Sequence, residues 1–184
     1  MKDCIALGMY ITSLAGAMVA AALARDAAAE GFVDFGINGT HVDAAIATLP
    51  ENVESDASGL HVGGGFRREL ARGSIGARIE LDDLDGDLLV AVRALDYRRH
   101  LSQRLALTAF GGAARLGLDT PAQGWYIGGG VQIKDLWPRW SLSLDLRYGD
   151  KLARDNVLPT DPQGGSPDNF YDLSGVTIYL SRGF

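Results

Sequence analysis

Residues 140–148 read WSLSLDLRY, and the alternation in this stretch decides the fold class. In an extended chain the odd-numbered and even-numbered positions point to opposite faces. The apolar face would carry Trp140, Leu142, Leu144, Leu146 and Tyr148. The polar face would carry Ser141, Ser143, Asp145 and Arg147. A period of two predicts a β-strand whose faces meet chemically different surroundings.

The same alternation recurs along the chain after residue 30. It is clear in residues 76–82 and 125–134 and weaker elsewhere, and no stretch shows a 3.6-residue helical stripe. The chain is therefore predicted to be all-β. The expected strands cover residues 31–42, 60–69, 76–82, 88–98, 103–115, 125–134, 140–148 and 173–184.

The first thirty residues have a different composition. A basic start at Lys2, an uncharged stretch over 5–24 and small residues at 27–29 are typical of a secretory signal peptide. We expect cleavage between Ala29 and Glu30, with cleavage after Ala24 as the alternative. A retained membrane helix is the competing interpretation, because about 20 apolar residues can span a bilayer. The predicted division is a signal peptide over 1–29 and a β domain over 30–184.

Charge and cysteine content exclude several classes of protein. The net charge of −6 offers no basic surplus to neutralise phosphates, which argues against nucleic-acid binding. The single cysteine, Cys4, falls in the predicted signal peptide, so the β domain has neither a disulfide nor a cysteine-based zinc site. An exported domain of this kind needs another source of stability.

The connections between the predicted strands alternate in length. Long or acidic ones fall at 43–59, 82–87, 116–123 and 150–172, and short ones fall at 70–74, 99–102 and 135–139. In an antiparallel up-and-down meander, this alternation places the long loops at one end and the tight turns at the other. Outer-membrane barrels have this asymmetry. The pattern favours an eight-stranded transmembrane β-barrel.

A soluble sandwich would also alternate, but side-chain placement favours lipid. The predicted interior face carries charges of both signs, which suits pairing inside a barrel: Asp34, Arg67, Arg78, Glu80, Arg93, Asp145 and Arg147. Aromatic residues gather towards strand ends, as in the girdles at membrane interfaces. Those at the short-turn end are Phe32, Phe35, Tyr97, Trp137, Trp140 and Phe184, and those at the long-loop end are Trp125 and Tyr148.

The last strand carries a family resemblance. Phe184 ends the chain, and Leu180, Ile178 and Val176 precede it on the same face. This pattern resembles the assembly signal of outer-membrane barrels, although Arg182 stands where an apolar residue is more usual. Residues 31–184 resemble the small OmpA/opacity-type barrels. The resemblance implies residence in the outer membrane, contact with its lipid and lipopolysaccharide, and recognition of the last strand by the barrel assembly machinery.

Several stretches invite a chemical interpretation. The glycine runs at 63–65, 111–112 and 128–130 lack the spacing of a phosphate-binding loop and are better explained by curvature or by room for an aromatic neighbour. The carboxylate run at 82–87 has Leu81 where an EF-hand register needs an acid, so an Asp-Gly turn is the simpler interpretation. We predict no metal site and no cofactor.

Histidines give no complete catalytic site. His100 and Ser102 match the His-x-Ser spacing of outer-membrane lipid A deacylases, but the glutamate that follows in that family is absent, since the chain has none after Glu80. A basic periplasmic turn is the favoured interpretation. His41 and His61 stand alone in the sequence and are expected to be structural or solvated.

The predicted function is therefore that of a small outer-membrane barrel with a structural or surface-interaction role, and not an enzyme. Eight strands leave an interior that side chains can fill, so a wide pore is not expected. A surface ligand would meet the loops at 43–59 and 150–172, the second of which contains Asn169, Phe170 and Tyr171. The alternatives are a lipid A-modifying enzyme of the same architecture and a soluble periplasmic β-protein.

Overall fold

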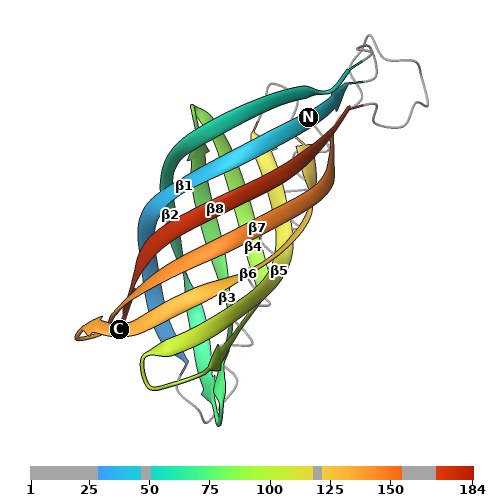
Figure 1. Cartoon of the computed structure of the whole chain (residues 1–184). Coiled ribbons are helices and arrows are strands. Elements are labelled where there is room, and N and C mark those ends of the chain that lie inside the picture. Colours follow the sequence, from blue (N-terminus) through green and yellow to red (C-terminus); the bar gives the residue numbers. More distant parts are fainter. Residues whose placement is uncertain (1–28, 47–50, 118–121, 155–168) are drawn as a thin grey trace, which may run out of the picture.

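The chain forms one closed antiparallel β-barrel in which strands neighbouring in sequence pair in space (Figure 1). The computed structural model describes residues 29–46, 51–117, 122–154 and 169–184. The strands are β1 (Glu30–Ile46), β2 (Val53–Leu70), β3 (Gly73–Leu84), β4 (Asp87–His100), β5 (Leu105–Gly117), β6 (Ala122–Trp137), β7 (Trp140–Arg154) and β8 (Asn169–Gly183). β1 pairs with both β2 and β8, which closes the sheet and leaves no free edge.

The alternation in β7 separates the two surfaces of the wall. Leu144, Leu146 and Tyr148 are 39%, 58% and 49% exposed on the outside, while Asp145 and Arg147 are buried inside. A soluble protein covers such a side-chain stripe, whereas a barrel in a bilayer presents it to lipid. Apolar outward residues recur on the other strands, including Ile37, Leu60, Ile79, Leu107, Ile127 and Ile178. The fold is an eight-stranded transmembrane barrel. The alternative prediction of a soluble periplasmic sandwich is therefore wrong.

The strands extend further than the sequence predicts at the long-loop end. Most of the predicted loop at 43–59 is strand, because β1 continues to Ile46 and β2 begins at Val53. The predicted connection at 82–87 is a tight hairpin turn at Asp85 and Gly86. Likewise, β7 runs on to Arg154, and Asn169 to Tyr171 belong to β8.

At the opposite end the turns are short, as the sequence predicts. Residues 71–72, 101–104 and 138–139 join successive strands there. The start of β1 lies beside the end of β8, with Phe32 opposite Gly183. The C-terminus therefore lies at the short-turn end (Figure 1).

The predicted signal peptide lies outside the described residues except for Ala29, and β1 begins at Glu30. Within the described ranges, no helix is long and apolar enough to cross a bilayer.

Most of the predicted girdle residues lie on the outside of the barrel. Trp125, Trp137 and Tyr148 are 72%, 61% and 49% exposed, and Trp140 lies half-buried on the same surface. Phe32 is a correction, because it points inward and is 1% exposed. Alternation in β1 places Phe32 on the same face as Asp34, so the girdle at this strand is carried by Phe35.

Candidate functional site

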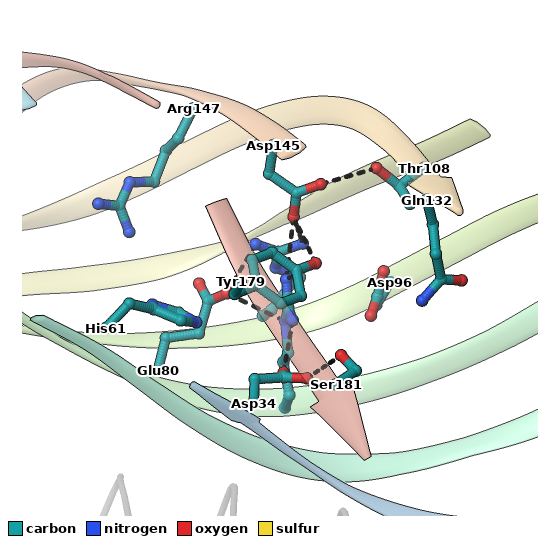
Figure 2. Close-up of polar contacts among 12 residues, drawn as sticks. Asp34, His61, Glu80, Asp96, Thr108, Gln132, Asp145, Arg147, Tyr179 and Ser181 are labelled. Carbon is teal, nitrogen blue, oxygen red and sulfur yellow. Dashed lines mark hydrogen bonds and ion pairs between the residues drawn. The ribbon is translucent and has the colours of Figure 1, made fainter. Parts of the chain in front are cut away.

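The barrel interior holds a buried network of charges that includes Asp34, Glu80 and Asp145 (Figure 2). Arg78 joins these three carboxylates. Arg78 Nη1 donates to Asp34 Oδ2 at 2.7 Å, and Nη2 donates to Asp145 Oδ2 at 3.0 Å. Its Nε atom lies 3.0 Å from Glu80 Oε1. These residues come from β1, β3 and β7, so one guanidinium group joins three strands across the interior.

A second guanidinium group completes this network. Arg93 on β4 lies 2.6 Å from Glu80 Oε1 through Nη2 and 2.8 Å from Asp145 Oδ2 through Nη1. The planar guanidinium also stacks on the ring of Phe110, 3.3 Å from its centroid. The ring in turn packs against Gly128, where a Cβ would clash, so this glycine makes room for an aromatic neighbour.

Neutral hydroxyl groups satisfy the remaining carboxylate oxygens of the network. Tyr179 OH accepts from Arg78 and donates to Asp145 at 2.9 Å. Thr108 donates to Asp145 at 3.0 Å, Tyr126 donates to Glu80 at 3.1 Å, and Ser181 bonds to Asp34. Buried charges are tolerated only when they are paired and hydrogen-bonded in this way. The sequence analysis did not identify these hydroxyl residues as members of the network.

Next to this network, towards the long-loop end, lies a histidine–carboxylate pair. His61 Nδ1 lies 2.5 Å from Asp82 Oδ1, and Arg147 Nη1 donates to Asp82 Oδ2 at 2.7 Å. The His61 ring packs against Tyr179 with a centroid separation of 5.3 Å. His61 is isolated in the sequence but not in the fold, where Asp82 lies directly opposite it on β3, and its buried pairing is a structural role.

A third group of charges lies towards the short-turn end. Arg98 pairs with Asp96 at 3.1 Å, and both side chains are buried inside the barrel. The guanidinium of Arg67 lies 4.1 Å from the Phe32 ring centroid, and that of Arg98 lies 5.6 Å from it. Of the predicted interior residues, Asp34, Arg78, Glu80, Arg93 and Asp145 thus form one network, while Arg147 and Arg67 lie in the layers on either side of it.

An apolar cluster lies in the interior between the charge network and the long-loop end, and its members Phe110 and Tyr126 also contact that network. Its buried members are Leu84, Leu89, Ala91, Phe110, Ala114, Leu116, Ala122, Tyr126, Leu152 and Leu173. We call this cluster the apolar cap. The sequence analysis assigned only polar residues to the interior and did not identify the cap. The charge groups and the cap thus follow one another along the barrel interior.

The acidic run at 82–87 is divided between the interior and a turn. Asp82 is buried with His61, whereas Asp83 Oδ1 accepts from the Gly86 backbone N–H at 3.0 Å. Asp85 and Gly86 have φ values of 54° and 102°, the left-handed conformations of a tight hairpin turn. An Asp-Gly hairpin thus explains the run. Within the described ranges, no three His, Cys, Asp or Glu side chains are grouped in a way that could hold a metal.

His100 and Ser102 do not form a catalytic pair in this structure. Ser102 Oγ accepts from the backbone N–H groups of Arg104 and Leu105, at 3.3 Å and 3.1 Å, and so shapes the β4–β5 turn. His100 Nε2 lies 3.9 Å from Glu69 Oε2. Ser102 therefore has a structural role in this turn, and His100 lies near a carboxylate of β2.

His41 belongs to an exposed pair on the outside of the barrel. Its Nδ1 atom lies 2.8 Å from Asp56 Oδ1 on the neighbouring strand. Along the outer face of β1 the pair follows Phe35, Ile37 and Gly39, so it lies beyond the apolar band at the long-loop end. The hydrogen bond to Asp56 raises the pKa of His41 above its ordinary value. His41 is therefore not isolated either.

The last strand presents the expected apolar face. Val176, Ile178 and Phe184 are 40%, 43% and 69% exposed on the outside, and Leu180 lies on the same face. Arg182, the departure from the apolar pattern, lies opposite Trp140 and places its guanidinium 5.6 Å from the indole ring centroid. The charged residue therefore sits within the aromatic girdle.

Comparison with known proteins supports the fold. No protein-family model matches the chain, and no curated protein sequence matches it. Among solved structures it is similar to Ail, the attachment invasion locus protein of Yersinia pestis, with a TM-score of 0.53 and 10% identity over 85% of this chain and 99% of that one. Another structure of Ail, in complex with the heparin analogue sucrose octasulfate, gives a TM-score of 0.52.

Neisserial surface protein A is also similar, with a TM-score of 0.51 and 12% identity over 84% of this chain and 97% of that one. At such low identity these matches show a shared fold. The chain is a small eight-stranded barrel of the outer-membrane type, and its membership of the OmpA/opacity-type family remains a prediction.

Proposed function

We propose that this chain is a closed outer-membrane barrel that stabilises the envelope and presents its long-loop end as an interaction surface. The observation that carries the proposal is the filled interior. Arg78 and Arg93 cross-link the strands with Asp34, Glu80 and Asp145, and the apolar cap lies above them. In a wall of eight strands this leaves no room for a wide water-filled path.

Planar-bilayer recording tests this proposal. The purified, folded protein should give no large and steady conductance, because ions would have to cross both the charge network and the apolar cap. A matched variant with Leu89→Ser and Leu152→Ser makes the cap polar while leaving the network intact, and it should raise the frequency of brief openings. A large, steady conductance from the wild-type protein would contradict a closed interior.

The surface at the long-loop end is acidic. Its exposed carboxylates include Glu51, Glu54, Asp56, Asp83, Asp85, Asp87 and Asp150. A sulfated polyanion such as the analogue in the Ail complex would be repelled by this surface. We therefore assign to this end a partner with basic groups, and contact with lipopolysaccharide phosphates through bridging divalent cations.

Retention on charged resins distinguishes these ligand classes. The folded protein in neutral detergent should pass through heparin resin at physiological ionic strength and be retained by a polylysine resin. Replacing Asp83, Asp85 and Asp87 with Asn should weaken the second interaction. Firm binding to heparin would contradict the assignment.

The last strand is the candidate signal for the assembly machinery. Val176, Ile178 and Phe184 lie on one outward face of this strand, which Arg182 alone interrupts between residues 176 and 184. Deleting Phe184 should reduce insertion in cells while the purified chain still refolds into detergent. Equal loss in both settings would mean that Phe184 acts on stability and not on recognition.

We propose no catalytic role, because the backbone contacts of Ser102 and the distance between His100 and Glu69 fit a structural turn. Lipid A deacylation by the purified protein, lost in Ser102→Ala, would establish the enzymatic alternative instead.

A further inference from the structure

Exposed arginines surround the short-turn end of the barrel. They lie on β2, β4, β8 and the three turns at this end, and they are Arg68, Arg72, Arg99, Arg104, Arg139 and Arg182. We call this set the basic collar. The long-loop end lies at the opposite end of the barrel (Figure 1). Its described exposed carboxylates give it the opposite charge to the collar.

Part of the collar continues the lipid-facing surface. On three strands an arginine stands two positions beyond an outward apolar side chain: Arg68 after Phe66, Arg99 after Tyr97, and Arg182 after Leu180. A strand rises about 3.3 Å per residue, and strands in membrane barrels tilt by about 40°. Two residues therefore advance these side chains by about 5 Å along the membrane normal, which moves them from hydrocarbon into the headgroup layer.

The collar is available to an external anion. Within the part of the chain that the structure describes, none of its guanidinium groups forms an ion pair with a carboxylate, although Glu30, Glu69 and Asp135 are exposed at the same end. The guanidinium of Arg182 lies 5.6 Å from the Trp140 ring centroid, within the range of a cation–π contact. Arginine suits phosphate well, because its planar donors match two phosphate oxygens at once.

We propose that the basic collar binds the phosphodiester headgroups of anionic phospholipids in the periplasmic leaflet of the outer membrane. The proposal rests on the outer-membrane assignment, in which short turns face the periplasm. Charge complementarity and continuity with the apolar band identify lipid as the occupant. The arginines form a ring around the barrel and lie at headgroup depth, whereas a docked protein would be expected to bind a single patch. The collar would also fix the depth of the barrel in the membrane.

The proposal is tested by measuring which lipids associate with the folded protein. The protein is placed in vesicles of phosphatidylcholine, and the association of spin-labelled phosphatidylglycerol is compared with that of spin-labelled phosphatidylcholine. We expect a preference of about fivefold for the anionic lipid at low salt, the factor expected for one arginine near an anionic surface. The preference should fall as salt is raised, because exposed charges are screened.

Matched variants test whether the arginines of the collar cause the preference for anionic lipid. The triple variant Arg68→Gln, Arg99→Gln, Arg182→Gln removes half of the collar and should clearly lower the ratio, and the corresponding triple Lys variant should keep most of the preference. Heat-modifiable mobility, measured on each variant, reports insertion separately and so distinguishes failure of the barrel assignment from failure of this proposal.

Absence of anionic preference in the inserted wild-type protein would overturn the proposal and favour an acidic periplasmic macromolecule as the partner. An unchanged preference in the Gln variant would overturn the assignment of the collar.

Discussion

Arg78 is the residue on which most of the interior charges depend. It contacts Asp34, Glu80 and Asp145, and all of these side chains are buried. Substitution Arg78→Leu would leave buried carboxylates with too few cations, and removal of one partner of a buried ion pair costs about 3–5 kcal/mol. We expect a loss of this size in the free energy of unfolding, measured by denaturant titration in lipid vesicles.

Arg78→Lys is the control, because it keeps the charge but loses the forked donors, and it should show a smaller loss. A change below about 1 kcal/mol for Arg78→Leu, the scale of an exposed ion pair, would contradict the account of the network.

The hydrogen bond between His41 and Asp56 is a second single-residue feature, and its strength depends on pH. This hydrogen bond favours the protonated imidazole, so the pKa of His41 is raised. The interaction is fully present below the ordinary pKa of histidine and is lost as pH rises through the elevated value. An NMR titration of the His41 ring should show a midpoint above 6.5 that falls in Asp56→Asn. An identical midpoint in both proteins would show that Asp56 does not raise the pKa of His41.

The sequence predicts which charged residues face the interior, but it does not predict which residues on other strands they contact. Asp34, Arg78 and Glu80 each alternate with apolar residues within their own strand, which is a local signal. His61 and Asp82 are far apart in the chain and meet only because the β2–β3 register places them opposite each other. That register was not available from a local pattern.

At the scale of strands, the outward face of β8 gives a direct test of the environment. Ile178 is 43% exposed, and an exposed isoleucine in a soluble protein tolerates arginine at little cost. In a bilayer, Ile178→Arg should lower the free energy of unfolding by about 2–4 kcal/mol. Ser174→Arg, on the same face but beyond the apolar band, should cost no more than about 1 kcal/mol. Equal effects at the two positions would contradict a lipid-facing band.

Strand ends were the least predictable feature of the elements. Residues 43–46 and 53–59 extend β1 and β2 beyond the apolar band, where both faces carry small or polar residues and alternation disappears. The apolar cap was not predicted because the residues that form it lie next to other apolar residues in the sequence. Leu88 faces outward and Leu89 faces inward, so β4 begins as a continuous apolar run that does not distinguish lipid from interior.

At the scale of the whole molecule, the barrel combines three properties. Closure pairs the backbone groups that hydrocarbon would otherwise leave unsatisfied. The interior is divided between buried ion pairs and the apolar cap. The ends carry opposite charge, acidic where strands are long and basic where turns are short. The composition of the chain reflects this division, since its 47% hydrophobic content includes the lipid-facing band and the small internal cap.

The central claim is that this chain is a closed barrel inserted in the outer membrane. Membrane fractionation combined with gel mobility of unheated and heated samples tests it most directly. The account predicts that the protein stays with outer membranes through high-salt and carbonate washes, requires detergent for release, and migrates differently before and after boiling. Recovery in the soluble periplasmic fraction, with a single mobility that heating does not change, would contradict it.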